Sequence, residues 1–442
     1  MKGLLKSVDS PRVLTAGEMS APCLRLDVEI SSGAPDIPAQ CGSMAARCAW
    51  ILVWLDSEPI DSLVLEIPPS GLRGSQVDSA ILSVLDSEIS TRNVLKGEGP
   101  SPFLSSRTDI LQCAPDMTVA VCTRERPESL RNCLQSLLMQ DYPRFSVLIV
   151  DNFPETDRSK SVVHEFGSSK LHYLIEPRRG LSRARNTALR AVGDGIVAWI
   201  DDDEIADENW LAELARGFHN HPDADAIGGV VVPGELETWP QVWFEQYGGH
   251  NKHRGFMPAV FSPQSAIVQS PLYPLPAFGA GGNLACRVKS VLDVGGFDVA
   301  LGPGTPSMAS EDTRLLTDLL CAGGTVVYQP TAVTQHFHRR SIDELRMQMV
   351  GYSVGLTAFY MSLIVTRPAC VPQLIRLLPL MYRDLFSSES LRTSELPSEF
   401  PEDLLRAKRR GMIRGPASYL HSRLKAARVN RGKHSPPPQA AA

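Results

Sequence analysis

Four consecutive acids follow a short apolar segment near the middle of the 442-residue chain. Asp201, Asp202, Asp203 and Glu204 come directly after the apolar segment 197–200. Because packed carboxylates repel one another, such a cluster is typical of a site that holds a cation. Hard oxygen ligands favour Mg²⁺ or Mn²⁺ over Zn²⁺. For this segment alone, an acidic, solvated turn between a strand and a helix is an equally open interpretation.

The first expected strand ends in a loop, Thr123-Arg124-Glu125-Arg126-Pro127, that can attract an anion. Proline suits the first position of a helix, and a helix start flanked by arginines attracts phosphate. The loop lacks the glycine-rich patterns of dinucleotide-binding and P-loop sites, which disfavours a nicotinamide cofactor and an ATPase. A surface turn with two solvated arginines is the alternative.

Two later segments add an acid and more arginines. Asp151 stands at the end of the second expected strand, where an acid commonly holds a ribose or a base edge. An Asx turn at the strand end is the alternative for Asp151. The third strand leads into a helix start that carries Arg179 and Arg183, and such a start binds anions through its N–H groups and guanidiniums. Asn186 lies three residues after Arg183, on the same helix face.

An alternation of strands and helices positions these residues. We predict strands over residues 118–122, 145–150, 171–175 and 196–200, and helices over 127–139, 156–166, 182–192 and 208–218. Strands that alternate with helices imply parallel β-α-β units in a doubly wound sheet, so the predicted fold class is α/β. The carboxyl ends of parallel strands meet at one sheet edge, where such folds bind ligands. A nucleotide with a metal-bound diphosphate needs the residues that converge there.

The rest of the chain divides around this nucleotide-binding sheet. We expect disorder over residues 1–20, a small α+β domain over 21–96, a linker over 97–116 and the main domain over 117–360. A helical basic region follows over 361–430, and a disordered, low-complexity tail over 431–442. The irregular segment 234–276 is rich in Trp, Pro and Gly, which is typical of a functional loop.

Composition limits the compartment and the partners. The formal net charge is −5, so the chain as a whole is not a nucleic-acid binder. The nine cysteines include no CxxC pair, which favours buried thiols of a reducing compartment over a disulfide framework. The sequence contains neither a recognisable signal peptide nor an apolar run near the ~20 residues of a membrane span. We therefore expect a cytoplasmic protein.

The C-terminal region is strongly basic. Ten Lys or Arg lie within residues 406–433, and the last acid is Asp403. Because Gly411, Gly415 and Pro416 interrupt the segment, we expect two short helices at most. Such helices either bind the anionic inner face of a membrane peripherally or form a solvated tail, and both interpretations stay open.

Nine segments, in order between Val119 and Tyr360, give the chain a resemblance to a known family. They read VAVCTRERPESL, LIVDN, EPRRGLSRARN, AWIDDDE, FGAGGNLACR, GGFD, LGPGT, SEDTRL and HFHRR. Each one is weak evidence, but the ordered set is specific and covers over half of the chain. The chain resembles family-2-type glycosyltransferases of GT-A fold, in particular a bacterial soluble subgroup. The resemblance implies a Rossmann-like nucleotide-binding sheet with an acceptor subdomain.

The resemblance also implies roles for individual residues. Thr123 and Asp151 match residues that hold the uridine, and Asp201 matches the contact to the ribose. Asp203 matches the metal ligand, and His336 matches a second protein ligand of the metal. Further candidates are Arg124, Arg126, Arg183, Asn186 and Asp202 for the donor nucleotide, and Gly281, Gly282, Asn283 and Trp243 for the acceptor or the sugar.

The catalytic base is expected in the pair Glu311-Asp312, where the Asp is the usual base of the family. This chain departs from the family pattern of Gly-Glu-Asp followed by Leu and Asp, because Ser310 precedes the pair and Thr313-Arg314 follow it. We expect Arg314 to alter the choice of acceptor or to lower the pKa of the base.

The chemistry expected of these residues is glycosyl transfer. A leaving diphosphate needs a cation, here Mn²⁺ or Mg²⁺, and the acceptor hydroxyl needs a base within hydrogen-bond reach. A mechanism with one base and no carboxylate nucleophile inverts the anomeric carbon. We expect a uridine diphosphate sugar as donor, and a saccharide, a lipid-linked molecule or a small molecule as acceptor.

Two other interpretations stay open. A nucleotidyltransferase shares the sheet and the metal-binding acids, but it would need a glycine-rich loop with a lysine after the first strand. A non-catalytic protein that binds nucleotide sugars would tolerate the loss of Asp203 or Asp312, and the chain has both.

Overall fold

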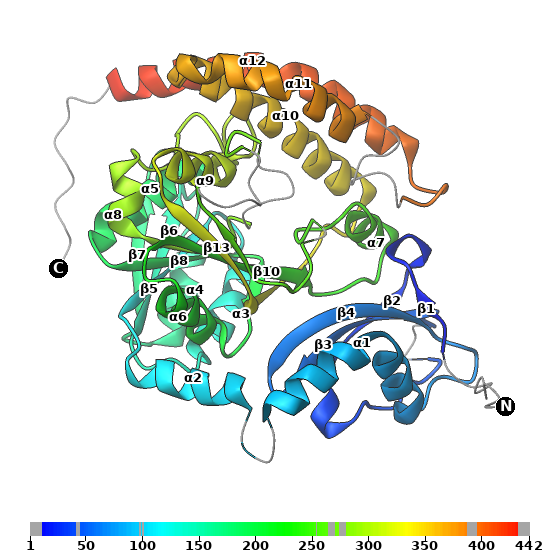
Figure 1. Ribbon diagram of the computed structural model, residues 1–442. Coiled ribbons are helices and arrows are strands. Elements are labelled where there is room, and N and C mark those ends of the chain that lie inside the picture. The colour runs from blue at the N-terminus through cyan, green and yellow to red at the C-terminus, as the bar shows by residue number, and fades with distance from the viewer. Residues whose placement is uncertain are drawn as a thin grey trace.

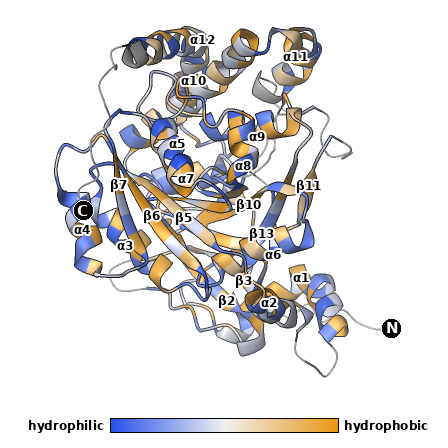
Figure 2. Ribbon diagram, turned by 90° about the vertical axis from the view of Figure 1, so that its left-hand side faces the viewer, coloured by the Kyte–Doolittle hydropathy of each residue, from blue (hydrophilic) through white to orange (hydrophobic). Residues whose placement is uncertain are grey.

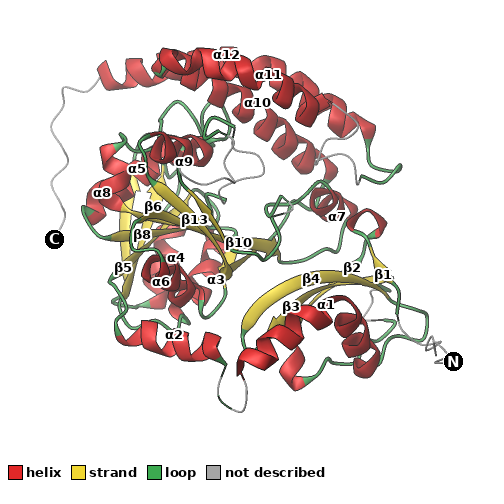
Figure 3. Cartoon of the chain, viewed as in Figure 1, coloured by secondary structure: helices red, strands yellow, loops and turns green. Residues whose placement is uncertain are grey.

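The computed structural model describes residues 11–40, 45–96, 99, 101–252, 254–263, 270–273, 280–386 and 396–431. In this part of the chain, a large mixed sheet lies between helices, and a small sheet with its own helix packs beside it (Figure 1, Figure 3). Helices α10 (Ile342–Thr366), α11 (Val371–Phe386) and α12 (Glu402–Arg431) lie together over one end of the molecule, away from the small sheet (Figure 1).

The main sheet contains nine strands. They are β5 (Met117–Thr123), β6 (Phe145–Asn152), β7 (Leu171–Glu176), β8 (Ile196–Asp201), β9 (Glu204–Ala206), β10 (Ala224–Pro233), β11 (Ala259–Phe261), β12 (Asn283–Arg287) and β13 (Thr325–His336). Their order is β11-β13-β10-β12-β8-β5-β6-β7, with β9 paired to β13. β7, β6, β5 and β8 are parallel, which confirms the expected α/β class. β12 is antiparallel to both β8 and β10, and β10 is parallel to β13.

Helices cover both faces of this sheet. One face packs against α3 (Pro127–Leu138), α4 (Arg158–Phe166) and α6 (Trp210–Asn220), and the other against α5 (Leu181–Val192), α8 (Val288–Asp293) and α9 (Glu311–Cys321). In β8, Ile196 and Ile200 join the first core, whereas Val197 and Trp199 join the second. Side chains alternate across a strand, so a strand buried on both faces is apolar throughout. Figure 2 shows these hydrophobic strands between helices with hydrophilic outer surfaces.

A four-stranded sheet precedes the main domain. Its strands are β1 (Val13–Leu14), β2 (Cys23–Glu29), β3 (Cys48–Leu55) and β4 (Glu58–Glu66), in the order β1-β4-β3-β2, with the 3-10 turns η1 (Ala16–Glu18) and η2 (Ile30–Ser32). In β3, Ile51 and Val53 pack in a core with helix α1 (Gly74–Lys96). Trp50 and Leu52 point the other way, into the core that contains Val230 of β10. The small sheet is therefore joined to the main domain by shared apolar packing.

The ends of this N-terminal unit are more regular than the sequence suggests. Residues 13–14 pair with β4 and residues 16–18 form a helical turn, although disorder was expected there. Residues 1–10 lie outside the described residues. Most of the expected linker is helix α2 (Pro102–Gln112), whose Phe103 N–H donates to Oγ of the N-cap residue Ser101 at 3.2 Å. Arg107 of α2 donates to Glu213 of α6 at 2.8 Å in a buried ion pair, which holds this segment on the main domain.

The segment 234–276 is partly regular. It contains helix α7 (Trp239–Gln246), which begins with a capping box at Thr238, and strand β11. Residues 253, 264–269 and 274–279 lie outside the described residues, as does the tail 432–442.

The C-terminal region forms α10 (Ile342–Thr366), the turn η3 (Pro368–Cys370), α11 (Val371–Phe386) and α12 (Glu402–Arg431). The expectation of two short helices is wrong, because α12 is continuous through Gly411, Gly415 and Pro416. A Cβ atom at Gly415 would overlap Thr357 Oγ1, so the glycine lets α12 approach α10 closely. Pro416 has no N–H for the carbonyl of Met412, and Thr357 Oγ1 donates to that carbonyl at 2.8 Å instead.

Helix α10 is long and apolar enough to cross a membrane by length and composition, and it is the one such helix within the described residues. Half of its most apolar window is buried inside the structure. Phe359 and Leu363, for example, pack with Leu374 and Met381 of α11. In this structure, α10 is the central helix of the C-terminal layer.

Candidate active site

A cavity of about 960 Å³ lies at the carboxyl edge of the main sheet, below α10 and α12. The chain leaves β5 toward β6 and β7 and then returns to the other side of β5 as β8. Open α/β sheets bind ligands at such a reversal of strand order. The predicted site residues that line the cavity are Thr123, Arg124, Arg126, Asp201, Asp202, Asp203, Gly281, Gly282, Glu311, Asp312 and His336.

Asp202 anchors the loop that follows β5. Its Oδ2 accepts from Thr123 Oγ1 at 2.7 Å, and its Oδ1 accepts from Arg126 Nη1 at 3.0 Å. Burial raises the pKa of Asp202 to about 6, with the adjacent Asp203 as a further cause and Arg126 opposing it. These contacts fix the loop and bring its arginines to the cavity wall.

Asp203 lies between two arginines and a histidine. Its Oδ2 accepts from Arg126 Nη1 at 2.9 Å and from Arg339 Nη2 at 3.3 Å. Its Oδ1 lies 3.7 Å from His336 Nε2, which is too long for a hydrogen bond. The structure therefore brings together the two residues that were predicted to bind a metal.

Arg185 of α5 joins the two acidic groups of the cavity, although it was not predicted as a site residue. Its Nη2 donates to Asp201 at 3.3 Å and to the carbonyl of Gly281 at 3.0 Å, and its Nη1 donates to Glu311 at 3.2 Å. The guanidinium is buried, and its acidic neighbours outweigh the burial and raise its pKa. Helical spacing could have revealed this role, because Arg185 shares the sheet-facing side of α5 with Ala188 and Leu189.

The expected base lies at the start of α9. Asp312 Oδ2 accepts from the N–H of Gly281 at 3.0 Å, and its Oδ1 accepts from the N–H of Thr313 at 2.6 Å. Its neighbour Glu311 is buried, and burial raises the pKa of Glu311 to about 7, with Asp312 as the second cause. Both acids line the cavity, but they differ in burial, since Glu311 is buried and Asp312 is only partly buried.

Gly281 and Gly282 make room for carboxylates. A Cβ atom at Gly281 would lie 2.8 Å from the Cβ of Asp312 and 2.9 Å from Arg185 Nη1. A Cβ atom at Gly282 would overlap the carboxylate of Glu204. Close approach is thus the reason for both glycines, and the groups that approach here are side chains of the site itself, among them Asp312 and Glu204.

The expectation for Arg314 is wrong. Its guanidinium points into the interface of α9 and α10, where Nε donates to Asp318 at 2.8 Å and Nη1 donates to Ser362 at 2.7 Å. Arg314 does not line the cavity, and its bonds to Ser362 and Thr366 join α9 to α10.

Five predicted residues lie outside the cavity lining. Asp151 accepts from Tyr173 at 2.7 Å, Asn186 pairs with both backbone groups of Phe297, and Asn283 accepts from Trp210 at 2.9 Å. Arg183 is buried beside Gly180, and Trp243 stacks near Trp239. These side chains support the loops and strands that carry the site.

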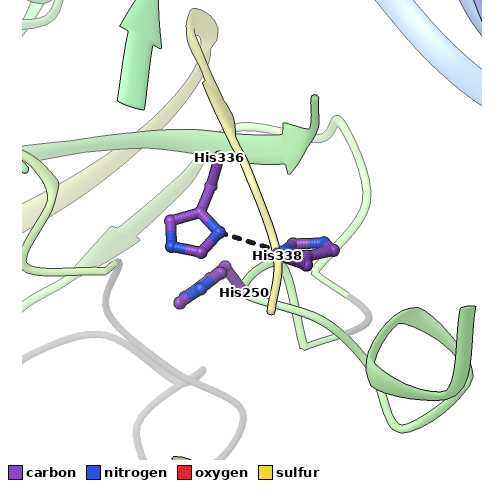
Figure 4. Close-up of side chains that lie close together, drawn as sticks. All are labelled: His250, His336 and His338. Atoms are coloured by element: carbon purple, nitrogen blue, oxygen red, sulfur yellow. Dashed lines mark hydrogen bonds between the residues drawn. The ribbon is translucent and has the colours of Figure 1, made fainter. Parts of the chain in front are cut away.

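Three histidines gather next to Asp203. His250, His336 and His338 have ring nitrogens that lie within 4.8 Å of one another, and Figure 4 shows their rings side by side. Burial, together with neighbouring cations and histidines, lowers the pKa of His250 and His336 well below its usual range. Both rings are therefore neutral at neutral pH.

The main sheet, with acids at its carboxyl edge, defines an open α/β protein whose cavity lies where the strand order reverses. Two family models match the chain, glycosyl transferase family 2 over residues 118–267 and glycosyl transferase family group 2 over residues 196–394. Together they cover more than half of the chain, and the chain belongs to the family-2 glycosyltransferases. Family and sheet topology agree with the GT-A fold that the resemblance implied.

The curated relatives include a glucosyl-dolichyl phosphate glucuronosyltransferase of Haloferax volcanii, 31% identical over 193 residues, which are 42% of this chain and 57% of that protein. A pre-mycofactocin glycosyltransferase of Mycobacterium tuberculosis is 28% identical over 234 residues, which are 52% of this chain and 44% of that protein. The chain spans about half the length of these relatives. Among solved structures, a mannosyltransferase of Pyrobaculum calidifontis in complex with GDP-Man and Mn²⁺ is 17% identical, with 74% of this chain and 89% of that chain covered and a TM-score of 0.44.

Proposed function

We propose that the chain transfers a sugar from a uridine diphosphate sugar to an acceptor hydroxyl, with Mn²⁺ or Mg²⁺ and with inversion at the anomeric carbon. One observation carries the proposal. Asp312 and the acids that follow β8 face one cavity, and Arg185 bridges the two groups through Glu311 and Asp201. The family and both relatives named above carry the names of glycosyltransferases, which supports the same reaction class.

Asp312 is the proposed base. Backbone N–H groups of Gly281 and Thr313 hold its two oxygens in a fixed orientation. Thr313 Oγ1 also donates to Oδ1 at 3.3 Å. A carboxylate has about four lone-pair positions, so these three bonds leave acceptor capacity for one further hydroxyl. Held in this way, Asp312 takes the proton of the acceptor hydroxyl as that oxygen attacks the anomeric carbon. Attack opposite to the leaving diphosphate inverts the carbon.

Asp203 and His336 are the proposed protein ligands of a divalent cation. Their Oδ1 and Nε2 atoms face each other at 3.7 Å, a separation that suits two ligands of one cation better than a hydrogen bond. A carboxylate with one imidazole suits Mn²⁺ and also accepts Mg²⁺. When bound, the cation neutralises charge on the leaving diphosphate. Arg126, Arg179 and Arg339 on the cavity wall supply further positive charge for the phosphates.

The acceptor is proposed to bind on the side of the cavity that α10 and α12 line. Met347 and Tyr352 of α10 and Met412 of α12 line this part of the cavity, together with Lys408. Apolar side chains next to a cation suit an acceptor that has an apolar part and an anionic group. The name of the Haloferax volcanii relative contains a dolichyl phosphate, which supports a lipid-linked acceptor.

A peripheral contact with the anionic inner face of a membrane is proposed for α11 and α12. Both helices expose apolar side chains, and α12 also exposes a row of cations, which is the combination that binds an anionic interface. The apolar side chains are Ile375, Leu378, Ile413 and Leu424, and the cations include Arg409, Arg410 and Arg414.

The proposed reaction can be tested with the purified chain and a panel of nucleotide sugars, in Mn²⁺, Mg²⁺ or EDTA. We expect metal-dependent release of uridine diphosphate. Release of nucleotide from guanosine diphosphate sugars alone would overturn the proposal that the donor carries uracil. Asp203→Ala is expected to lose metal-dependent binding of uridine diphosphate in calorimetry while keeping its melting temperature. Asp223→Ala, at an exposed acid before β10, is the matched control. Unchanged metal-dependent affinity in Asp203→Ala would contradict the metal assignment.

A further inference from the structure

A chain of hydrogen bonds links the histidines beside Asp203 to a carboxylate of α7. Glu245 Oε1 lies 2.6 Å from His338 Nε2, and His338 Nδ1 lies 2.9 Å from His336 Nδ1. The side chains of His336 and His338 are buried, with 4% and 3% of their residue surfaces exposed. Figure 4 shows the contact between these two rings, with the ring of His250 next to them.

The position of each proton in this series of hydrogen bonds can be assigned by starting from Glu245. A carboxylate only accepts hydrogen bonds, so the proton between Glu245 and His338 belongs to His338 Nε2. A neutral imidazole has one N–H, which makes His338 Nδ1 an acceptor. His336 must then donate from Nδ1. The other nitrogen of His336, Nε2, keeps its lone pair, and it is the nitrogen that lies 3.7 Å from Asp203 Oδ1.

We propose that Glu245 and His338 are positioning residues, which hold His336 in the tautomer whose Nε2 can bind the cation shared with Asp203. The cation rests on the proposed function, whereas the tautomer rests on the two hydrogen bonds and on a single N–H in each ring. Partners that orient a metal-binding histidine in this way typically change metal affinity by about 10- to 100-fold. Glu245 lies 93 residues before His338, so only the fold brings the pair together.

Packing holds the rings in this arrangement. Phe244, the residue before Glu245, contacts the rings of His250 and His338 edge-on, with centroids 5.1 and 4.7 Å apart. The ring of His250 lies 4.3 Å from that of His336, between centroids. His336 therefore has little freedom to turn its ring over and exchange the two nitrogens.

The three histidines could instead hold a cation that prefers nitrogen, such as Zn²⁺, because His250 Nε2 is buried with no hydrogen-bond partner among the described residues. Two nitrogens bound to one tetrahedral zinc stand about 3.3 Å apart, at zinc–nitrogen distances of ~2.0–2.1 Å. The separation between His336 Nδ1 and His338 Nδ1 is 2.9 Å, which suits a shared proton better.

Nitrogen-15 NMR of histidine side chains in the metal-free protein tests the tautomer directly. We expect a proton on Nδ1 of His336, with the signal assigned by its loss in His336→Gln. His338→Leu removes the acceptor, and it should shift the proton of His336 toward Nε2. Binding of Mn²⁺, followed by the electron paramagnetic resonance of the free ion, should weaken about 10- to 100-fold in this variant.

His338→Asn is the matched variant, because its Oδ1 can lie where Nδ1 of the histidine lay. We expect it to restore most of the Mn²⁺ affinity and the Nδ1 proton of His336, whereas a merely structural role would leave Leu and Asn alike. A proton on Nε2 of His336 in the unmodified protein would overturn the proposal, as would unchanged Mn²⁺ affinity in His338→Leu.

A titration with Zn²⁺ tests the competing arrangement, in which the three histidines bind one cation. Tight binding of Zn²⁺ that erases the Nδ1 proton of His336 and is lost in His250→Gln would establish a three-histidine site and overturn the tautomer assignment. Because the NMR measurement needs no sugar donor, an absence of glycosyl transfer would refute the proposed function without altering the result for the tautomer.

Discussion

The two sheets bury alternating apolar side chains in the same way, but their acids have different surroundings. In the N-terminal sheet, each acid of the turn between β3 and β4 has its own partner, as in the ion pairs of Asp56 with Lys96 at 2.9 Å and of Glu58 with Arg92 at 3.1 Å. In the main sheet, Asp201 and Glu311 share one arginine, and Glu204 Oε2 is buried with no hydrogen-bond partner among the described residues. These acids at the cavity therefore lower the stability of the main domain, and the packing of the rest of the domain compensates for that loss.

The largest effect is expected for the base. Asp312→Asn keeps the shape of the side chain and removes its basic lone pair, so glycosyl transfer should fall by ~10²–10⁴-fold. Binding of the donor should stay within a few-fold, since the amide oxygen can still accept from Gly281. Single-turnover kinetics and calorimetry measure the two quantities separately. A transfer rate near that of the parent would rule out Asp312, and Glu311→Gln would then be tested.

Arg185 offers a comparison of stability between the two sheets. Arg185→Leu leaves Asp201 and Glu311 without their shared cation, so the free energy of unfolding should drop by about 3–5 kcal/mol. Lys96→Leu breaks the partly exposed pair with Asp56 and should cost about 1 kcal/mol or less. Urea unfolding of both variants decides this, and equal losses would mean that the two ion pairs are alike in energy.

The sequence predicts the part of this fold in which strands and helices alternate. Strands β5 to β8 and the helices between them have the expected order. Each strand is a short apolar run, and each helix has apolar residues at helical spacing. The antiparallel insertion of β12 and the pairing of β10 with β13 were not predicted. Gly228 and Gly229 weaken the strand signal of β10, and only tertiary pairing supports it.

The candidate site likewise contains residues that the sequence predicts and residues that it does not. Residues directly after strands, such as Thr123 and Asp203, were predicted to line the site because strand ends meet at one edge. Arg185 and Glu245 were missed, since their roles depend on contacts with segments that are distant in the chain. Conversely, Asn186 was expected to bind the donor but pairs with the backbone of Phe297, because polarity alone does not tell which partner a side chain finds.

The raised pKa of Glu311 predicts how pH changes stability. In the folded state this pKa is about 7, above the value of 4.5 for an unperturbed glutamate. Between these two values the folded chain binds the proton more tightly than the unfolded chain, so stability should decrease as pH rises toward about 7 and then level off. Glu311→Gln should remove this contribution.

The measurement is the difference in urea midpoint between the parent and Glu311→Gln, at pH 5 and at pH 8. We expect the parent to lose stability relative to the variant at the higher pH. The same difference at both values would show that Glu311 titrates normally in the folded protein.

The last prediction concerns the membrane contact. Removing α12 would uncover α10, so substitution of exposed cations is the cleaner test. Arg409, Arg410 and Arg414 changed together to Gln should weaken binding to anionic vesicles by about 100-fold, at ~1 kcal/mol for each cation near the surface. Vesicle sedimentation at low salt measures this, and higher salt should weaken the parent in the same direction.

A matched triple variant separates this contact from net charge. Arg144, Arg158 and Lys160 are exposed cations of the main domain, and their change to Gln should leave vesicle binding nearly unaltered. Equal losses in the two triple variants would indicate nonspecific attraction, and a parent that ignores anionic vesicles at low salt would exclude the contact.

The cover that α12 gives to α10 is missing while the chain is being synthesised. Helix α10 ends at Thr366, and α12 is complete only at Arg431. At ~5–20 residues per second, a ribosome needs roughly 3–13 s to add the residues in between. During that interval, the apolar helix is available to chaperones and to the insertion machinery of membranes. Slower elongation of the C-terminal region lengthens this interval.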